Sequence, residues 1–166
     1  AIKNLLIVGL NDGHNTEIVF NTFKALNQIV SFDAHIYPFT SIPANPAAFV
    51  PATPFMHIAI DFLSQRYKNR FSFIEGDILQ TVPAYAQSNN QIFDLILIDK
   101  NASYEVALST LMNCKVFANQ STKVLIRGHF LTQAALAKCV SMGILEGLNG
   151  YSFNDDQPWA EARYLP

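Results

Sequence analysis

Charged residues are scarce in this chain of 166 residues: only 14% are Asp, Glu, Lys or Arg, whereas 50% are apolar. Acidic residues outnumber basic ones by 13 to 11, which gives a net charge of −2. A chain without a basic surplus lacks the attraction that binds phosphate backbones, so we expect no nucleic acid as a main partner. It also lacks a run of about 18 apolar residues, the length of a membrane-spanning helix, so we expect no membrane partner.

Cysteine is nearly absent as well. The two cysteines, Cys114 and Cys139, have neither the spacing of a metal motif nor that of a disulfide framework. Both fall in apolar helical patterns, which predicts reduced thiols in the core. No signal peptide is expected, because the first strand begins almost at residue 1. Together these features favour a cytoplasmic protein.

The chain does contain a regular alternation of short apolar runs and helical stripes. Strands are expected over residues 5–8, 31–37, 71–74, 93–99, 122–126, 151–153 and 161–165. Helices are expected over residues 16–26, 55–68, 102–117 and 131–142, with a short helix within 78–86 that breaks at Pro83. This pattern predicts an α/β fold: a Rossmann-like, doubly wound, mostly parallel sheet of about seven strands with helices on both faces. No linker interrupts residues 1–166, so we expect a single domain.

A proline-rich segment separates the second expected strand from the helix that follows it. Five prolines lie within the 17 residues from Pro38 to Pro54. That density excludes a regular helix or a central strand and predicts a long loop. Long loops often carry function, so one interpretation is a lid or substrate wall, and the other is a structural crossover.

The first strand is followed by a glycine turn and a helix. Gly9 and Gly13 bracket the turn, and Asn15 or Thr16 can cap the helix. Glu17 in the first helical turn complements the positive end of the helix dipole. A strand, a glycine turn and a helix in this order are typical of nucleoside-binding α/β domains. The alternative is a tight turn that only packs.

Polar residues gather where the expected strands end. They are Asn11, Asp12, Asn15, Tyr37, Gly76, Asp77, Asp99, Lys100, Asn101, Arg127 and His129. In parallel sheets, ligands bind at the carboxyl ends of the strands, which makes this set the candidate site. The alternative is that these positions are polar only because the strands emerge there into solvent.

Several segments resemble the core of class I S-adenosylmethionine-dependent methyltransferases, especially the small-molecule O-methyltransferase-like group. Residues 6–16 are similar to the glycine-rich first motif, and residues 62–79 to the helix and strand that lead into a Glu-Gly-Asp sequence. Residues 93–105 are similar to the fourth strand and the Asp-Gly-Asp-His-Ser-Tyr-Glu that often follows it, and residues 159–165 to the last strand. The order and spacing of these motifs carry the resemblance, which spans nearly the whole chain.

The resemblance implies S-adenosylmethionine as cofactor and assigns roles by position. The backbone near its methionine part would come from Gly9, Leu10, Asn11 and Gly13. Asp77 would accept a hydrogen bond from the adenine amino group, and Ile78 would touch the ring. Asp99 would face the methionine end, the substrate or, in the metal-dependent branch, a divalent cation.

The chain departs from the family pattern at three places. Tyr37, followed by Pro38, stands where the family has an acidic residue for the ribose hydroxyls, and a phenol cannot match a bidentate carboxylate. Val8 replaces the acidic residue that often begins the first motif. Residues 127–129, Arg-Gly-His, replace the Asp-Asn of the metal-dependent branch, so we expect no metal. The family's N-terminal helices also have no counterpart, which indicates an excised domain or a reduced member.

Methyl transfer needs an oriented acceptor and sometimes a proton acceptor. His129 and Asp99 are the candidate catalytic residues, and His14 is a second candidate base; the alternative for a lone histidine is a solvated or capping residue. Arg127 or Lys100 can bind an anionic substrate group, or simply be solvated. Trp159 and Tyr104 are expected to pack, although either can stack on adenine.

Three functional hypotheses follow. The first is methyl transfer from S-adenosylmethionine to a small-molecule or sugar acceptor. The second is an inactive methyltransferase-like domain that serves as a binding or assembly module, favoured by the departures at Val8 and Tyr37. The third, a nicotinamide-dependent enzyme, is disfavoured because the third glycine of its motif is absent and no acidic residue ends the second expected strand. Further domains of a longer protein and a homo-oligomer stay open as partners.

Overall fold

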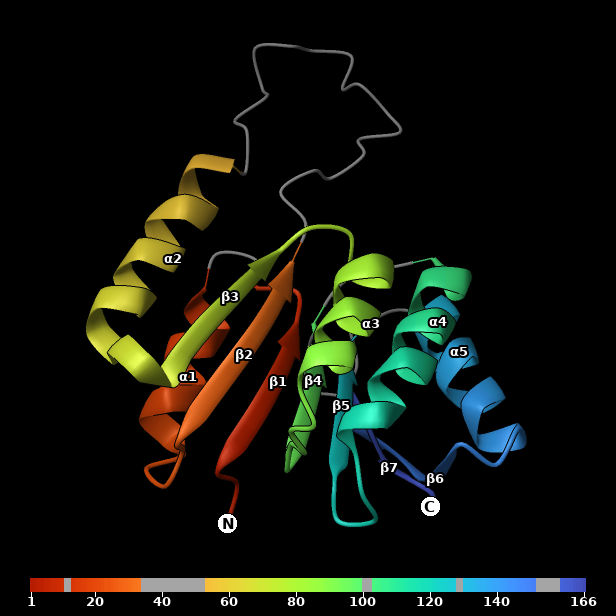
Figure 1. Ribbon diagram of the computed structural model, residues 1–166. Helices are drawn as coiled ribbons and strands as arrows, with labels where there is room; N and C mark the ends of the chain where they lie inside the picture. Colours follow the sequence, from red (N-terminus) through yellow and green to blue (C-terminus); the bar gives the residue numbers. More distant parts are fainter. Residues whose placement is uncertain (11–12, 34–52, 100–102, 128–129, 152–158) are drawn as a thin grey trace, which may run out of the picture.

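A computed structural model describes residues 1–10, 13–33, 53–99, 103–127, 130–151 and 159–166 (Figure 1). The strands are β1 (Asn4–Val8), β2 (Gln28–Asp33), β3 (Phe71–Glu75), β4 (Leu95–Ile98), β5 (Lys123–Arg127), β6 (Leu145–Tyr151) and β7 (Trp159–Tyr164). The α-helices are α1 (His14–Thr22), α2 (Thr53–Tyr67), α3 (Ile78–Ser88), α4 (Tyr104–Cys114) and α5 (Phe130–Ser141). None of these helices is long and apolar enough to cross a membrane.

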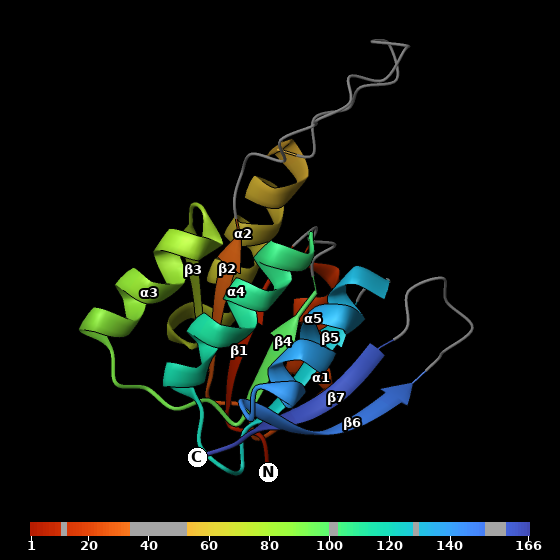
Figure 2. The ribbon, with the colours of Figure 1, turned by 90° about the vertical axis from the view of Figure 1, so that its right-hand side faces the viewer.

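The strands form a 7-stranded sheet in the order β3-β2-β1-β4-β5-β7-β6. The strands from β3 to β5 in that order are parallel, whereas β7 runs antiparallel to both β5 and β6 (Figure 2). This confirms the predicted α/β, Rossmann-like, mostly parallel sheet. The strand order reverses between β1 and β4, and ligands of such sheets bind outside the carboxyl ends at that point.

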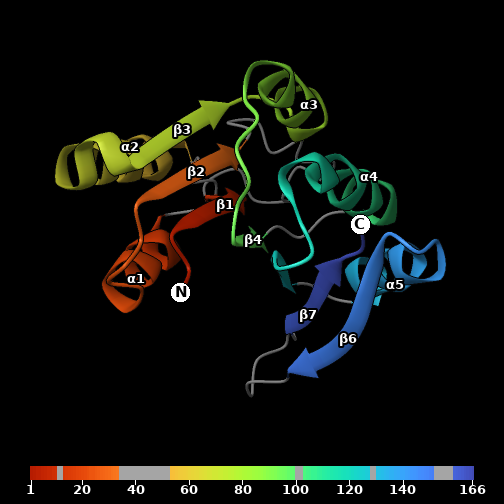
Figure 3. The ribbon, with the colours of Figure 1, turned by 60° about the horizontal axis from the view of Figure 1, so that its bottom comes forward.

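Helices cover the sheet on both faces (Figure 3). Because side chains alternate along a strand, Leu6 and Val8 of β1 join the core beneath α3, α4 and α5. Leu5 and Ile7 join a second core beneath α1 and α2. A strand that is buried on both faces has to be apolar throughout, which explains why β1 and β4 are continuous apolar runs.

The second strand begins and ends earlier than the sequence analysis predicts. β2 covers Gln28–Asp33 rather than residues 31–37. Ile29 and Val30 are fully buried and pair with β1. In the sequence no glycine or proline separates them from the apolar stripe of α1, so the start of the strand is not marked. The last two strands differ as well. β6 covers Leu145–Tyr151, so it shares only Tyr151 with the predicted 151–153, and it contains a bulge between Glu146 and Asn149. β7 covers Trp159–Tyr164 rather than residues 161–165.

Two helix predictions are also corrected. α1 ends at Thr22 instead of residue 26, because the backbone of Phe23 leaves the helical region. Its N-cap residue is Gly13, not Asn15 or Thr16. α3 runs through Pro83 without a break. A proline removes only one backbone hydrogen-bond donor, and the burial of Ile78 and Val82 against the sheet outweighs that loss.

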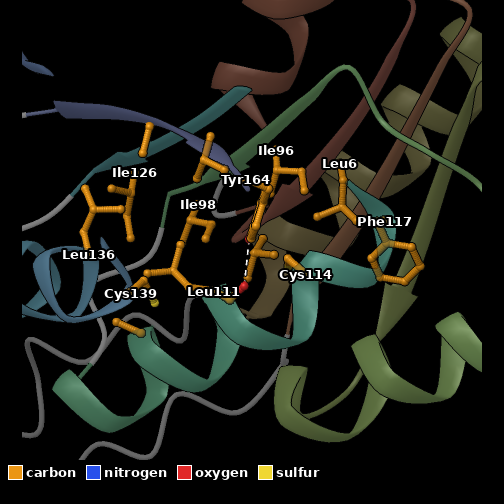
Figure 4. Packing of buried hydrophobic residues seen from close by; sticks show 14 of the residues in the cluster. Leu6, Ile96, Ile98, Leu111, Cys114, Phe117, Ile126, Leu136, Cys139 and Tyr164 are labelled. Carbon is orange, nitrogen blue, oxygen red and sulfur yellow. Dashed lines mark hydrogen bonds between the residues drawn. The ribbon is translucent and has the colours of Figure 1, made fainter. Parts of the chain in front are cut away.

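The core beneath α4 and α5 contains a buried polar contact. The Tyr164 hydroxyl donates a hydrogen bond to the carbonyl oxygen of Leu111 over 2.7 Å (Figure 4). Cys114 and Cys139 lie in the same cluster as free, buried thiols, as predicted. Burial raises the pKa of Cys114 to about 12 and raises that of Tyr164 well above its usual value. These groups are therefore uncharged at neutral pH and serve packing.

Replacing Tyr164 with Phe tests this contact. We expect the free energy of unfolding to fall by about 1 kcal/mol, because the buried carbonyl of Leu111 loses a hydrogen-bond donor. Urea unfolding measures the change. Tyr104→Phe, on the half-buried start of α4, is the matched control and should cost less than about 0.5 kcal/mol. Equal losses in the two variants would contradict the assigned role of the Tyr164 hydroxyl.

Candidate functional site

The turn after β1 is built from backbone that requires glycine. Gly9 has a φ of 99° and donates its N–H to the carbonyl of Phe32 in β2. Gly13, with a φ of 76°, donates its N–H to the carbonyl of Leu10, whose side chain is buried. A Cβ at Gly13 would lie 2.9 Å from the Cβ of Ala59 in α2. Gly9 is thus bonded to β2 at the carboxyl end of β1, and Gly13 allows α1 to approach α2 closely.

An acidic residue ends β2, and the sequence analysis missed it. Asp33 is the last residue of the strand and is 0% exposed. Its carbonyl accepts the N–H of Gly76, and across the ladder it pairs with Glu75 of β3. A prediction of β2 that ends at residue 33 would have found it, because an acidic residue at that strand end is part of the pattern that the chain resembles.

Asp77 and Ile78 follow β3 and begin α3. Asp77 is the N-cap residue, and its Oδ1 accepts the N–H of Leu79 over 3.0 Å. The carboxylate is exposed, and its Oδ2 makes no hydrogen bond to the described residues. Ile78 is only 5% exposed and packs into the core. The capping role explains an Asp at this position and uses only one of its two carboxylate oxygens.

Asp99 follows β4 directly and is, like Asp33, a buried acidic group at this edge. Its side chain is 1% exposed and its backbone N–H donates to the carbonyl of Val8. Asn15 of α1 donates from Nδ2 to Oδ2 over 2.5 Å, and the Arg127 Nε lies 2.5 Å from Oδ1. A buried carboxylate needs such partners, because an unpaired charge in the interior is very costly. The three residues connect α1, β4 and β5.

Arg127 is held from a second side by the aromatic ring of Trp159. The two residues are partners in the ladder between β5 and β7, and the guanidinium carbon lies 5.6 Å from the ring centre. Trp159 therefore packs, as expected, and its packing partner is this arginine.

The predicted site residues in the described chain lie along one edge of the sheet, the carboxyl ends of neighbouring strands. They are Gly9, Leu10 and Gly13 after β1, Asp77 and Ile78 after β3, and Asp99 after β4. The glycine turn and Asp77 thus lie at the same end of the molecule. Asn11, Tyr37 and His129 lie outside the described residues, as does the segment from 38 to 52, so their roles stay predictions.

A divalent cation does not fit this arrangement well. Such a cation needs several oxygen ligands, and Asp99 already pairs with the cationic side chain of Arg127. Within the parts of the chain that the structure describes, no three His, Cys, Asp or Glu side chains are grouped as a metal would require. The charge balance of Asp99 therefore comes from the protein itself.

No protein-family model and no curated protein sequence matches the chain. Solved structures do match. The mitomycin 7-O-methyltransferase MmcR superposes with a TM-score of 0.68 over 99% of this chain, at 12% identity. The chain has the class I methyltransferase fold. It spans 49% of the length of the mitomycin enzyme.

Two further matches show how widely this methyltransferase fold is used. An rRNA methylase from Streptococcus thermophilus has a TM-score of 0.64 at 9% identity, with 99% of this chain and 88% of that chain covered. Fibrillarin from Aeropyrum pernix, solved with natively bound S-adenosyl-L-methionine, has a TM-score of 0.65 at 13% identity, with 96% and 66% covered. The shared fold does not decide the acceptor.

The ion pair between Asp99 and Arg127 is tested by a double-mutant cycle. Arg127→Gln should lower the free energy of unfolding by about 3 kcal/mol, because it leaves the carboxylate of Asp99 buried without its countercharge. Adding Asp99→Asn should restore part of that loss, so the two changes are expected to be non-additive by at least about 1 kcal/mol. Urea unfolding of the four proteins measures the coupling.

The pair Lys123–Glu161 is the matched control for this cycle. It joins β5 to β7 at 3.0 Å, but its side chains are 44% and 18% exposed. Its coupling should stay below about 1 kcal/mol. If the coupling between Asp99 and Arg127 were no larger than this, the assignment of a buried, stabilising ion pair would be wrong.

Proposed function

We propose that the chain binds S-adenosylmethionine at the carboxyl ends of β3, β2, β1 and β4 and transfers the methyl group to a small-molecule or sugar acceptor. One observation carries the proposal: suitable groups stand in a row along that edge. In strand order they are Asp77, Asp33, the turn at Gly9 and Asp99. An elongated ligand lying along the edge would meet them in this order.

The acidic residues suit the nucleoside part of the cofactor. We assign the Asp33 carboxylate to the ribose hydroxyls, because an ionised carboxylate accepts two charge-assisted hydrogen bonds. Asp33 lies beside Asp77 in the row, since β2 and β3 are neighbours. The Oδ2 of Asp77, left over by the capping bond, is assigned to the adenine amino group. These two assignments place adenine toward β3.

The other half of the row suits the methionine part. The backbone of Gly9 has no side chain to keep a ligand away, and it stands between β2 and β4. Beyond it, Asp99 and its partner Arg127 lie at the methionine end of the row. Both oxygens of Asp99 already contact Arg127 and Asn15, so we assign this residue to positioning rather than to proton removal.

The cofactor supplies an activated methyl group on a sulfonium. The chain's own work is then to hold the acceptor in line with that group and, for a hydroxyl acceptor, to accept a proton. His129 remains the predicted proton acceptor. A small acceptor is favoured over a nucleic acid because the chain has a net charge of −2 and no basic surplus.

Calorimetry with S-adenosylhomocysteine tests the proposal. We expect saturable binding, and Asp33→Asn should weaken it about tenfold or more, because the ribose loses a charge-assisted acceptor. The matched control is Asp61→Asn, the same chemical change at an exposed position of α2, which should leave the affinity unchanged.

The absence of heat up to millimolar ligand would contradict the proposal and favour the binding or assembly module. Equal affinities of the wild type and Asp33→Asn would contradict the assignment of Asp33 alone. The midpoint of urea unfolding, measured for both variants, shows whether a loss of binding reflects a loss of structure.

A further inference from the structure

The guanidinium of Arg127 is positioned by two contacts of its own, and a third contact holds one of its partners. Its Nε pairs with Asp99, whose other oxygen accepts a hydrogen bond from Asn15, and its guanidinium carbon lies over the ring of Trp159. Arg127 is the last residue of β5, next to β4. Its side chain is 29% exposed, so part of it reaches the surface.

The terminal nitrogens of Arg127 are not used by these contacts. A guanidinium has five N–H donors in a fixed plane, and one of them is on Nε. Within the described residues, Nη1 and Nη2 make no further hydrogen bond or ion pair. The remaining donors match two oxygens of a carboxylate or phosphate group, and the side chain is already ordered before any ligand binds.

Lys123 shows the difference between this arrangement and an ordinary surface pair. It lies on the same face of the same strand, but at the amino end, and its ammonium pairs with Glu161. An exposed lysine pair of this kind is common on sheet surfaces and adds little. Arg127 is instead fixed by a buried acid and an aromatic ring at the edge where the acceptor would lie.

We propose that Arg127 determines acceptor specificity by binding an anionic oxygen group, a carboxylate or a phosphate, of the acceptor molecule. This inference rests on the proposed function, because it places the acceptor at the carboxyl end of β5, beside the methionine end of the cofactor. The acceptor class is then a small acid or a phosphorylated sugar. Asp99 is the positioning residue for Arg127.

The chain carries its own reporter for this site. Trp159 is the one tryptophan in the sequence, and its ring is 5.6 Å from the guanidinium carbon. Titration with inorganic phosphate and with acetate, at an ionic strength kept constant with chloride, should therefore give a saturable change in tryptophan emission. Phosphate alone would assign a phosphorylated acceptor, and acetate alone a carboxylic acid.

Variants separate specific binding from a general salt effect. Arg127→Gln should abolish the saturable change, and Arg127→Lys, which keeps the charge but not the forked donors, should weaken it about tenfold. Lys123→Gln removes one positive charge from the same face and should leave the change intact. The double variant Asp99→Asn with Arg127→Gln avoids a buried unpaired carboxylate and should also show no response.

The inference is overturned if chloride gives the same emission change, if Arg127→Gln keeps it, or if neither anion has an effect. Calorimetry with S-adenosylhomocysteine on the same samples distinguishes this failure from that of the proposed function. If the nucleoside ligand binds and the anions do not, only the role of Arg127 falls. If the anions bind and the nucleoside ligand does not, the anion-binding role of Arg127 is supported and the proposed methyltransferase function is contradicted.

Discussion

The buried carboxylate of Asp99 is the interaction on which the candidate site depends. It receives Nδ2 of Asn15 from α1 and Nε of Arg127 from β5, while its own backbone is bonded to β1. A charge that is removed from water is tolerated only when opposite charge and hydrogen bonds compensate it, so these partners have to keep their places. The position of Asp99 therefore ties the first helix, the central strands and the antiparallel end of the sheet to one another.

Much of the architecture could be predicted from the sequence, because the period of the apolar residues changes between strands and helices. The doubly wound sheet and its carboxyl edge follow from that alternation. The ends of β2 could not be located in this way, since Ile29 and Val30 continue the apolar stripe of the preceding helix. The start and end of β2 are set by its burial between β1 and β3, which is a tertiary property that local sequence does not show.

The candidate site was predicted in part for the same reason. Gly9, Asp77 and Asp99 follow clear apolar strands, so their place at the edge could be read directly. Asp33 was missed through an error of a few residues in β2, and Tyr37 was put in its place. The contacts of Arg127 were not predictable, because Asp99 and Trp159 lie far from it in the sequence and meet it only in the fold. With an acidic residue at the end of β2, one of the two departures that favoured an inactive module loses its support.

The central claim is that the carboxyl edge of the parallel strands is where the chain holds a nucleoside cofactor. The most direct measurement is the change in backbone amide NMR signals on addition of S-adenosylhomocysteine. The account predicts the largest shifts at Gly9, Leu10, Asp33 and Asp77, and unchanged signals for Lys3 and Asn4 at the opposite end of the sheet. Shifts that are concentrated at the amino ends of the strands, or spread over the outer surface of α2, would contradict it.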